Sequence, residues 1–324
     1  MLRNAFFIHF FMLKKIFLTV LCSLLGLVFI ISGYLKLYPI EPFEYTFVDI
    51  GIFNWQVAPF IARFLIGLEL FIGFLLLFNI YLHKLAYKSG VLVLLIFCMY
   101  LVLLIFLSGN KGNCGCFGTY FQMTPLQALI KNIIMLGIFF VLLKFHNGWK
   151  VAKKIRYIII LIVVTIFTLP FVLNPVQLDY SEAYLNKPEN NSYIPLDSLY
   201  NSASLNIPPK SLSSKKHVLV FLSLKCKYCR IAANKIRIIH ERNSKIPFYF
   251  VLNGEEQDLK HFFEDTHTED IPHCLLLGRN FVYLAGVELP VIYLINNSIV
   301  EHQVNYLDLD QENLENWLKR GSKN

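Results

Sequence analysis

The chain has 324 residues, of which 56% are hydrophobic and 16% are charged, and its mean hydropathy is +0.52. This composition is too apolar for an ordinary soluble protein and indicates membrane segments. The formal net charge of +8 would suit a nucleic-acid-binding protein, but much of the basic excess flanks apolar segments. We therefore predict no nucleic-acid partner and treat the charge as a signal of membrane topology.

Five stretches in the first 175 residues are apolar and long enough to cross a bilayer at about 20 residues each. They lie near Ile16–Leu37, Val57–Phe78, Ser89–Leu107, Leu126–Leu143 and Tyr157–Leu173. Lys14-Lys15 before the first stretch resembles the start of a signal peptide, but no convincing cleavage site follows. We predict a five-span membrane domain over residues 1–175, with Met12 as an alternative start.

The basic residues predict the orientation of these spans. With a cytoplasmic N-terminus, ten of them lie inside: Arg3, Lys14, Lys15, Lys84, Lys88, Lys144, Lys150, Lys153, Lys154 and Arg156. Only Lys36, Arg63, Lys111 and Lys131 then lie at or near the outer side, as the positive-inside rule favours. We predict a multi-pass protein of the bacterial inner (cytoplasmic) membrane, with the C-terminal domain in the periplasm or an equivalent extracytoplasmic space.

The loop between the third and fourth spans contains Cys114-Gly115-Cys116 within a glycine-rich stretch. Glycine permits the tight backbone that a disulfide between cysteines two apart would need. Such a small ring should be strained and easily exchanged. The alternatives are a glycine-rich turn with two incidental cysteines, or copper binding by a thiolate pair.

Ionisable residues inside membrane spans are costly and often functional. Arg63 and Glu69 lie in the second span, and Lys131 with Asn132 lies in the fourth. One interpretation is a structural ion pair, for example Glu69 with Lys131. The other is a proton site or a quinone head-group site, in which Glu69 and Lys131 would bind the cofactor.

These residues carry a resemblance to a known family. Ser32-Gly33-Tyr34-Leu35-Lys36-Leu37, Gly67-Leu68-Glu69, Cys114–Gly118 (CGCFG) and Lys131-Asn132 resemble the DoxX-like superfamily, and within it the methylamine-utilisation MauE family. The resemblance covers roughly residues 12–145. It implies a four-helix DoxX-like bundle, to which the fifth span is added, and a redox-associated membrane protein.

Residues 176–212 are polar, contain four prolines and show little periodicity, so we predict a tether. Residues 213–324 then form one small domain. Its predicted order is a strand at 218–222, a helix to Ile239, a strand at Ile246–Asn253 and a helix at Glu255–Thr266. A less regular stretch, Ile271–Gly286, precedes strands at Leu289–Ile295 and Ile299–Val304 and a helix near Leu309–Lys319.

The first strand of this domain leads into Cys226-Lys227-Tyr228-Cys229 at the start of a helix. A thiol in this position gains acidity from the positive end of the helix, and two cysteines three apart can form a disulfide. The alternative is half of a zinc site, but His217, His240 and Cys274 do not supply two further ligands at comparable spacing. We therefore predict redox chemistry and no metal site, with Cys274, like Cys22 and Cys98, as a packing residue rather than a third redox thiol.

This order of elements and the CxxC motif resemble the thioredoxin fold, closest to membrane-tethered TlpA-like versions. The resemblance implies that Cys226 is the nucleophile, that Cys229 resolves the mixed disulfide, and that Pro290 is a cis-proline facing the motif. Thioredoxins bury an acidic residue six positions before the first cysteine, where this chain has Val220. Lys225 and Lys227 flank Cys226 and should favour its thiolate.

The predicted fold class is therefore a membrane α-helical bundle followed by an α/β thioredoxin-like domain. We predict a thiol–disulfide oxidoreductase that relays electrons between extracytoplasmic client proteins, Cys226/Cys229 and Cys114/Cys116, with a quinone as the candidate membrane carrier. Its other partner is membrane lipid. The alternatives are a copper-handling or maturation factor, and a non-catalytic membrane anchor that binds a partner.

Overall fold

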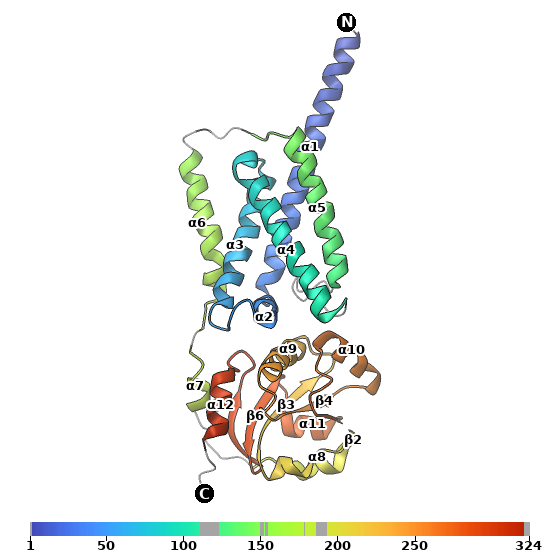
Figure 1. The fold of residues 1–324 in the computed structure, drawn as a ribbon, viewed down its shortest axis with the longest axis vertical. Helices are drawn as coiled ribbons and strands as arrows, with labels where there is room; N and C mark the ends of the chain where they lie inside the picture. Colours follow the sequence, from blue (N-terminus) through green and yellow to red (C-terminus); the bar gives the residue numbers. More distant parts are fainter. Residues whose placement is uncertain are drawn as a thin grey trace. The chain divides into compact units, whose positions relative to one another are not determined.

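The computed structural model describes residues 2–110, 123–149, 152, 155–177, 179–185 and 193–320. The chain forms two compact units, Met1–Val176 and Gln177–Asn324. Figure 1 gives the labels of the helices and strands.

The first unit consists of helices, five of which are long and apolar enough to span a membrane. The helices are α1 (Leu2–Leu37), α2 (Glu41–Asp49), α3 (Ala58–Leu77), the π-helical turn η1 (Leu82–Ala86), α4 (Tyr87–Ser108), α5 (Pro125–Phe145) and α6 (Arg156–Leu173). The spans are Met12–Leu37, Ala58–Leu77, Leu82–Leu107, Pro125–Phe145 and Arg156–Leu173, which confirms the five predicted segments. The short helix α2, between the first two spans, was not predicted.

Helices α1 and α3 cross closely at two glycines. A Cβ atom on Gly26 would lie 2.8 Å from the carbonyl oxygen of Gly73, and one on Gly73 would lie 2.9 Å from that of Gly26. Small residues at helix contacts allow backbones to approach closely in membranes, where packing rather than hydrophobicity drives association. This crossing brings the second half of α1, with Lys36, against the part of α3 that carries Glu69.

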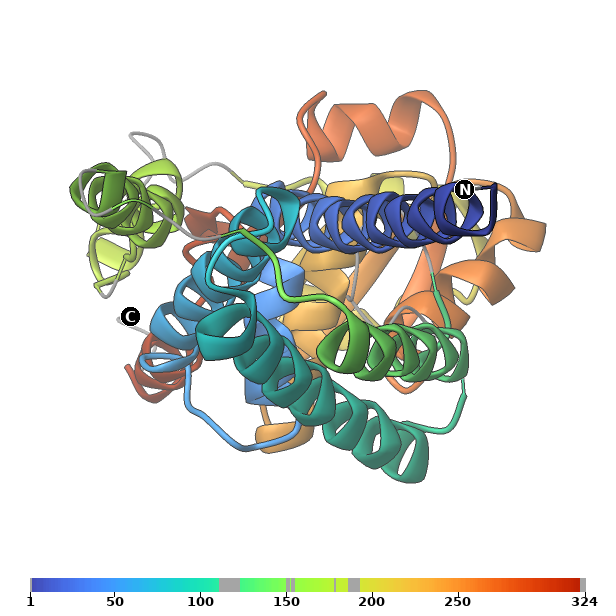
Figure 2. The same ribbon diagram turned by 90° about the horizontal axis from the view of Figure 1, so that it is seen from above.

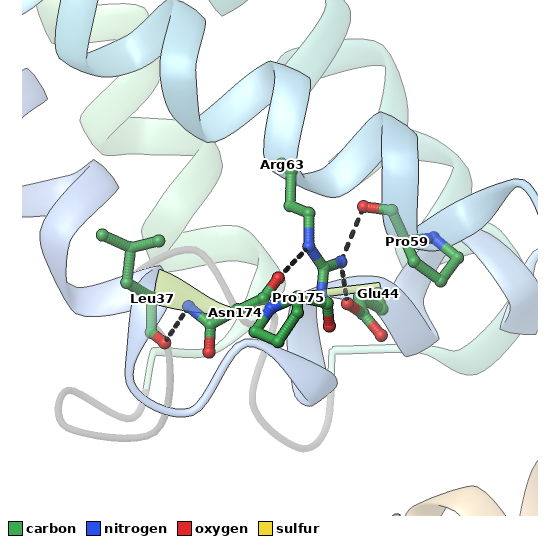
Figure 3. A network of polar contacts seen from close by, with 6 residues as sticks. All are labelled: Leu37, Glu44, Pro59, Arg63, Asn174 and Pro175. Carbon is green, nitrogen blue, oxygen red and sulfur yellow. Dashed lines mark hydrogen bonds and ion pairs between the residues drawn. The ribbon is translucent and has the colours of Figure 1, made fainter. Parts of the chain in front are cut away.

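The fifth span, α6, lies at the edge of the helical unit beside α3 (Figures 1 and 2). Arg63 of α3 is hydrogen-bonded to the residues that follow α6. The Arg63 guanidinium donates to the carbonyl oxygens of Asn174 at 2.6 Å and Pro175 at 3.3 Å (Figure 3). It also donates to Glu44 at 2.5 Å and to the carbonyl oxygen of Pro59 at 2.8 Å. This intramembrane arginine is therefore structural in this network, because it holds the segment that follows the last span.

The second unit is built on a six-stranded mixed sheet in the order β2-β5-β4-β3-β6-β7. Strands β3/β4 and β4/β5 are parallel, whereas β3/β6, β6/β7 and β2/β5 are antiparallel. The strands are β2 (Ala203–Leu205), β3 (Lys216–Ser223), β4 (Phe248–Asn253), β5 (His273–Leu276), β6 (Val291–Asn296) and β7 (Ile299–Val304). The helices are α7 (Glu182–Leu185), α8 (Leu196–Ser202), the 3₁₀ turn η3 (Lys210–Ser213), α9 (Lys227–Arg242), α10 (Glu256–Thr266), α11 (Arg279–Ala285) and α12 (Gln311–Lys319).

The central strand β3 is buried on both faces, as its continuous apolar sequence predicts. Leu219 and Phe221 share a core cluster with residues of α8 and α11, including Leu199 and Phe281. Side chains alternate along a strand, so Val218, Val220 and Leu222 point to the opposite face, and all three are fully buried. This rigid strand ends at the CxxC motif and fixes its position.

Two segments differ from the prediction. Part of the proposed tether at 176–212 belongs to the folded unit, because β2 pairs with β5 and because Leu196, Leu199 and Leu212 are buried in the core. The stretch Ile271–Gly286 contains strand β5 and helix α11, which are short and so carry little periodic signal. The predicted strand and helix order is otherwise confirmed.

Candidate functional site

The CxxC motif lies where β3 ends and α9 begins. Cys226 is the N-cap residue of α9, with extended backbone, and its sulfur accepts a hydrogen bond from the backbone N–H of Cys229 at 3.3 Å. The N–H groups of the first helical turn have no partners within the helix, so an anionic sulfur at the N-cap meets donors and the positive end of the dipole. The fold therefore stabilises a thiolate at Cys226.

The two thiols are in different environments and both are free. The pKa of Cys226 is lowered from 9.0 to about 6, chiefly by the hydrogen bond from the Cys229 thiol. The N–H groups of Cys229 and Tyr228 and the charge of Arg230 lower this pKa further, whereas burial raises it. The pKa of Cys229 is raised by that same interaction and by its complete burial. One thiol is thus partly exposed and acidic, and the other is a buried protonated donor beside it.

The neighbouring cations contribute differently from the prediction. Lys225 is exposed and forms an ion pair with Asp258 at 3.2 Å, so much of its charge is compensated. Arg230, which follows the motif directly, contacts Asp265 at 2.5 Å and donates to the carbonyl oxygen of Leu224 at 3.1 Å. The charge of Arg230 is among the causes of the lowered pKa of Cys226, after the hydrogen bonds from residues 228 and 229. Its place one residue after the CxxC was the available sequence signal.

A groove of about 810 Å³ lies beside the motif within the same unit. Tyr228 of the motif lines it, together with Leu289-Pro290 before β6 and residues 303–308 at the end of β7 and after it. The Leu289–Pro290 peptide bond is cis, as the thioredoxin resemblance implied. The groove thus combines the predicted Pro290 with the half-exposed ring of Tyr228.

Cys274 lies in β5 and is fully buried. Burial raises the pKa of its thiol to about 11, although a hydrogen bond with Tyr249 acts in the opposite direction. A buried protonated thiol without access to solvent is a poor nucleophile. This geometry agrees with a packing residue.

In the membrane unit, Glu69 forms an ion pair with Lys36 of α1 and not with Lys131, the partner that the sequence suggested. Lys36 Nζ lies 2.6 and 2.8 Å from the two carboxylate oxygens and also donates to Ser32 at 3.0 Å. Lys36 and Glu69 are 2% and 1% exposed. Lys36 falls at the end of a span, so its sequence position indicated an interfacial cation rather than a buried partner.

Glu69 and Lys131 nevertheless line one cavity, which has a volume of about 950 Å³. Asn132 and Cys98 line it too, and the side-chain amide of Asn132 donates a hydrogen bond to the Cys98 sulfur. Sequence reasoning named Asn132 beside Lys131 in the fourth span and as part of the family resemblance, and it treated Cys98 as a packing residue. Cys114 and Cys116 lie outside the described residues. Within the described ranges, no group of three or more His, Cys, Asp or Glu side chains could hold a metal ion.

Solved structures similar to this chain include two disulfide-exchange proteins. A secreted Mycobacterium tuberculosis disulfide oxidoreductase, described as homologous to Escherichia coli DsbE, is 14% identical, with 37% of this chain and 98% of that chain covered and a TM-score of 0.29. A thiol:disulfide interchange protein from Bacteroides sp. is 18% identical, with 35% and 78% covered and a TM-score of 0.28. The thioredoxin-like assignment rests on the strand order and on the position of the CxxC motif.

Sequence comparisons cover more of the chain. Residues 14–145 match the family model described as methylamine utilisation protein MauE, which confirms the resemblance of the membrane half. The chain is also 30% identical over 295 residues to protein TlpB of Flavobacterium psychrophilum, with 76% of this chain and 79% of TlpB covered. The chain therefore belongs to the family of protein TlpB and carries a MauE domain in its membrane half.

Proposed function

We propose that this multi-pass membrane protein is a thiol–disulfide oxidoreductase whose Cys226/Cys229 pair oxidises client proteins outside the cytoplasm. The observation that carries the proposal is the opposite shift of the two thiol pKa values at one helix start. With a pKa of about 6, Cys226 is about nine-tenths thiolate at pH 7. A group that is stable as a thiolate is both an available nucleophile and a good leaving group.

Client oxidation proceeds in two exchange steps. A client thiolate attacks the sulfur of Cys226 in the Cys226–Cys229 disulfide, and Cys229 leaves and takes up a proton. A second client thiolate then attacks the client sulfur of the mixed disulfide, and Cys226 leaves as its stabilised thiolate. The client gains one disulfide, and the motif gains two electrons.

The environment of the CxxC motif favours electron flow from client thiols to the motif. Stabilising the Cys226 thiolate favours the reduced form of the pair, which makes its disulfide more oxidising. Val220 supplies no base for deprotonating Cys229, so Cys229 attacks a client mixed disulfide less readily than it would beside a buried carboxylate. Both features favour client oxidation over client reduction.

The groove beside the motif supports client binding. Leu289 and Pro290 present backbone next to Tyr228, so an extended client segment can add alongside them as a strand while the Tyr228 ring contacts its side chains. Main-chain hydrogen bonds of this kind are independent of client sequence, which suits an enzyme with several clients.

The electrons then pass to the membrane half. In this proposal Cys114/Cys116, on the same side of the membrane by the count of basic residues, exchange with Cys226/Cys229, and a quinone is the final carrier. Tethering the two thiol pairs in one chain keeps their effective concentration in the millimolar range or so. The inner membrane and an extracytoplasmic C-terminal unit are part of this proposal.

Trapping tests the proposal. In cells, Cys229→Ser should accumulate disulfide-linked adducts through Cys226. The Cys226 thiolate can still attack a disulfide of a client or of Cys114/Cys116, but a hydroxyl at position 229 cannot then displace the partner from Cys226. The adducts should vanish on reduction, be absent from the matched Cys226→Ser variant, and include client peptides and the Cys114/Cys116 peptide. If non-reducing gels of Cys229→Ser show no adduct sensitive to reduction, the exchange function is refuted.

A further inference from the structure

The groove beside the CxxC motif has acidic walls. Its charged lining residues are Glu288, directly before Leu289-Pro290, and Asp308, in the segment after β7, and none of the described residues that line it is a lysine, an arginine or a histidine. Glu288 is exposed and Asp308 is half-buried, so solvent reaches both. Glu182 precedes the lining residue Ala183 and is exposed as well. The walls of the groove therefore carry a net negative charge.

Neither Glu288 nor Asp308 is neutralised by an ion pair within the part of the chain that the structure describes. Asp308 accepts one hydrogen bond, from the side-chain amide of Gln177 at 3.2 Å, which leaves its charge in place. Lys225 and Arg230 beside the motif, in contrast, are already paired with carboxylates of α10. The groove carboxylates are therefore available to a cation of a client.

Two lysines of α9 moderate this negative charge. Lys235 is 6% exposed, and its Nζ donates to the carbonyl oxygens of Tyr306 at 2.9 Å and Leu307 at 2.8 Å. Both carbonyls belong to the groove wall, so Lys235 fixes the backbone directly before Asp308. Its charge, and that of the half-buried Lys227 in the motif, offset part of the negative potential. We therefore expect a graded preference for cations rather than a strict requirement.

We infer that the groove selects client segments that carry a lysine or an arginine within a few residues of the reacting cysteine, with Glu288 and Asp308 as specificity-determining residues. The inference rests on the proposed function, in which Cys226 exchanges with client proteins. An extended segment advances about 3.3 Å per residue, so three residues span about 10 Å, the distance over which exposed charges interact at 0.1 M salt. Complementary charges at the rim of a binding site raise the rate of productive encounter.

The test uses synthetic peptides with one cysteine, activated as a mixed disulfide with 2-thiopyridine and flanked on both sides by lysine, glutamine or glutamate. The Cys226 thiolate attacks the peptide sulfur, the peptide–Cys226 disulfide forms, and 2-thiopyridine leaves with the electron pair of the broken bond. The full-length chain carries Cys229→Ser, Cys114→Ser and Cys116→Ser, so the captured peptide is retained and the membrane pair does not react. The rate of capture is measured by mass spectrometry on the Cys226 peptide.

The flanking charge also changes the reactivity of the activated disulfide itself, so the ratio of rates is compared with that of a neutralised groove. The lysine-to-glutamate rate ratio should be about three- to tenfold larger in the parent chain than in Glu288→Gln/Asp308→Asn at low ionic strength. Glu288→Gln alone should give an intermediate ratio. At about 1 M salt the difference should fall below about twofold, because the Debye length is then only about 3 Å.

Glu269→Gln is the matched control for the loss of one negative charge. Glu269 is exposed and lies before β5. Because β3, β4 and β5 run parallel and the motif follows the end of β3, Glu269 is at the opposite end of the sheet from the motif. Its replacement should leave the rate ratio unchanged. Equal ratios in the parent chain and in Glu288→Gln/Asp308→Asn, a difference that persists at about 1 M salt, or an equal loss in Glu269→Gln would overturn the inference.

The same assay separates this inference from the proposed function. Capture of every peptide at rates that do not depend on the groove carboxylates would refute the selection of basic clients and leave exchange at Cys226 standing. Capture of none of the peptides would mean that Cys226 is not an exchange thiol, and it would overturn the proposed function together with the inference.

Discussion

Replacing Cys229 by alanine or by serine separates the contributions to the acidity of Cys226. The hydrogen bond from Cys229 is the largest contribution to the lowered pKa of Cys226. Serine keeps a hydroxyl that can donate to the Cys226 thiolate, whereas alanine removes the donor. Both substitutions leave the backbone N–H groups of residues 228 and 229 and the charge of Arg230 unchanged. The pair of variants therefore isolates one side-chain hydrogen bond.

The expected magnitude follows from the thiolate fraction. A pKa of about 6 gives a thiolate fraction at pH 7 of about nine-tenths, against about one-hundredth at the ordinary value of 9.0. In Cys229→Ala the backbone amides remain, so we expect the pKa of Cys226 to rise by about one to two units rather than three. The fraction at pH 7 then falls to between about one-tenth and one-half. In Cys229→Ser it should stay near the wild-type value.

The assay is the pH dependence of alkylation at Cys226. The reduced full-length chain is treated with iodoacetamide between pH 4 and pH 10, and modification is measured on the Cys226 peptide by mass spectrometry, so that the other cysteines do not interfere. The alkylation rate should reach half of its plateau near pH 6 in the wild type and in Cys229→Ser. In Cys229→Ala the pH at half-plateau should be about one to two pH units higher. Equal midpoints in the two variants, or a wild-type midpoint near pH 9, would refute the reasoning.

Three substitutions test the supporting structure. Glu69→Gln leaves Lys36 buried without its counter-ion and should lower the free energy of unfolding in detergent by about 3–5 kcal/mol. The double change Lys36→Met/Glu69→Leu removes both charges and should recover most of that loss. Equal losses in the single and double variants would contradict the pairing. Arg63→Met removes the hydrogen bonds to the segment after α6 and should speed hydrogen exchange at the C-terminal end of that helix, and unchanged protection would argue against this anchor. Cys274→Ala should cost about 1 kcal/mol in the second unit yet leave Cys229→Ser trapping intact, and lost adducts would instead indicate a third redox thiol.

The elements with strong periodicity or length were predictable from the sequence. The five spans follow from uninterrupted apolar runs, and β3 follows from its run of buried branched residues next to the CxxC motif. Strand β5 was missed because four residues carry no period, although it pairs with β4 and β2 and buries Cys274. The segment before residue 213 was misjudged because its few apolar residues, Leu196 and Leu199 among them, are separated by polar ones and gain their burial only from the tertiary fold.

Some features of the candidate site could also be predicted from the sequence, and others could not. The roles of Cys226 and Cys229 depend on local geometry at one helix start, which a sequence motif encodes. The partner of Glu69 depends on how α1 and α3 cross, and the Gly26/Gly73 contact that sets this crossing joins residues far apart in the chain. The sequence suggested Lys131 as the partner of Glu69 because it lies in a neighbouring span. The packing of α1 against α3 makes Lys36 the partner instead.

The reduction potential of the Cys226/Cys229 pair tests the central claim most directly, because the proposed direction of electron flow depends on it. The stabilised Cys226 thiolate predicts a potential well above the thioredoxin value of about −270 mV, less negative than about −200 mV, with the pair mostly oxidised in cells. Equilibration of the full-length chain with glutathione buffers, followed by thiol labelling, gives this number. A potential at or below about −270 mV, with the pair reduced in cells, would identify a reductant and contradict the proposed oxidation of client thiols.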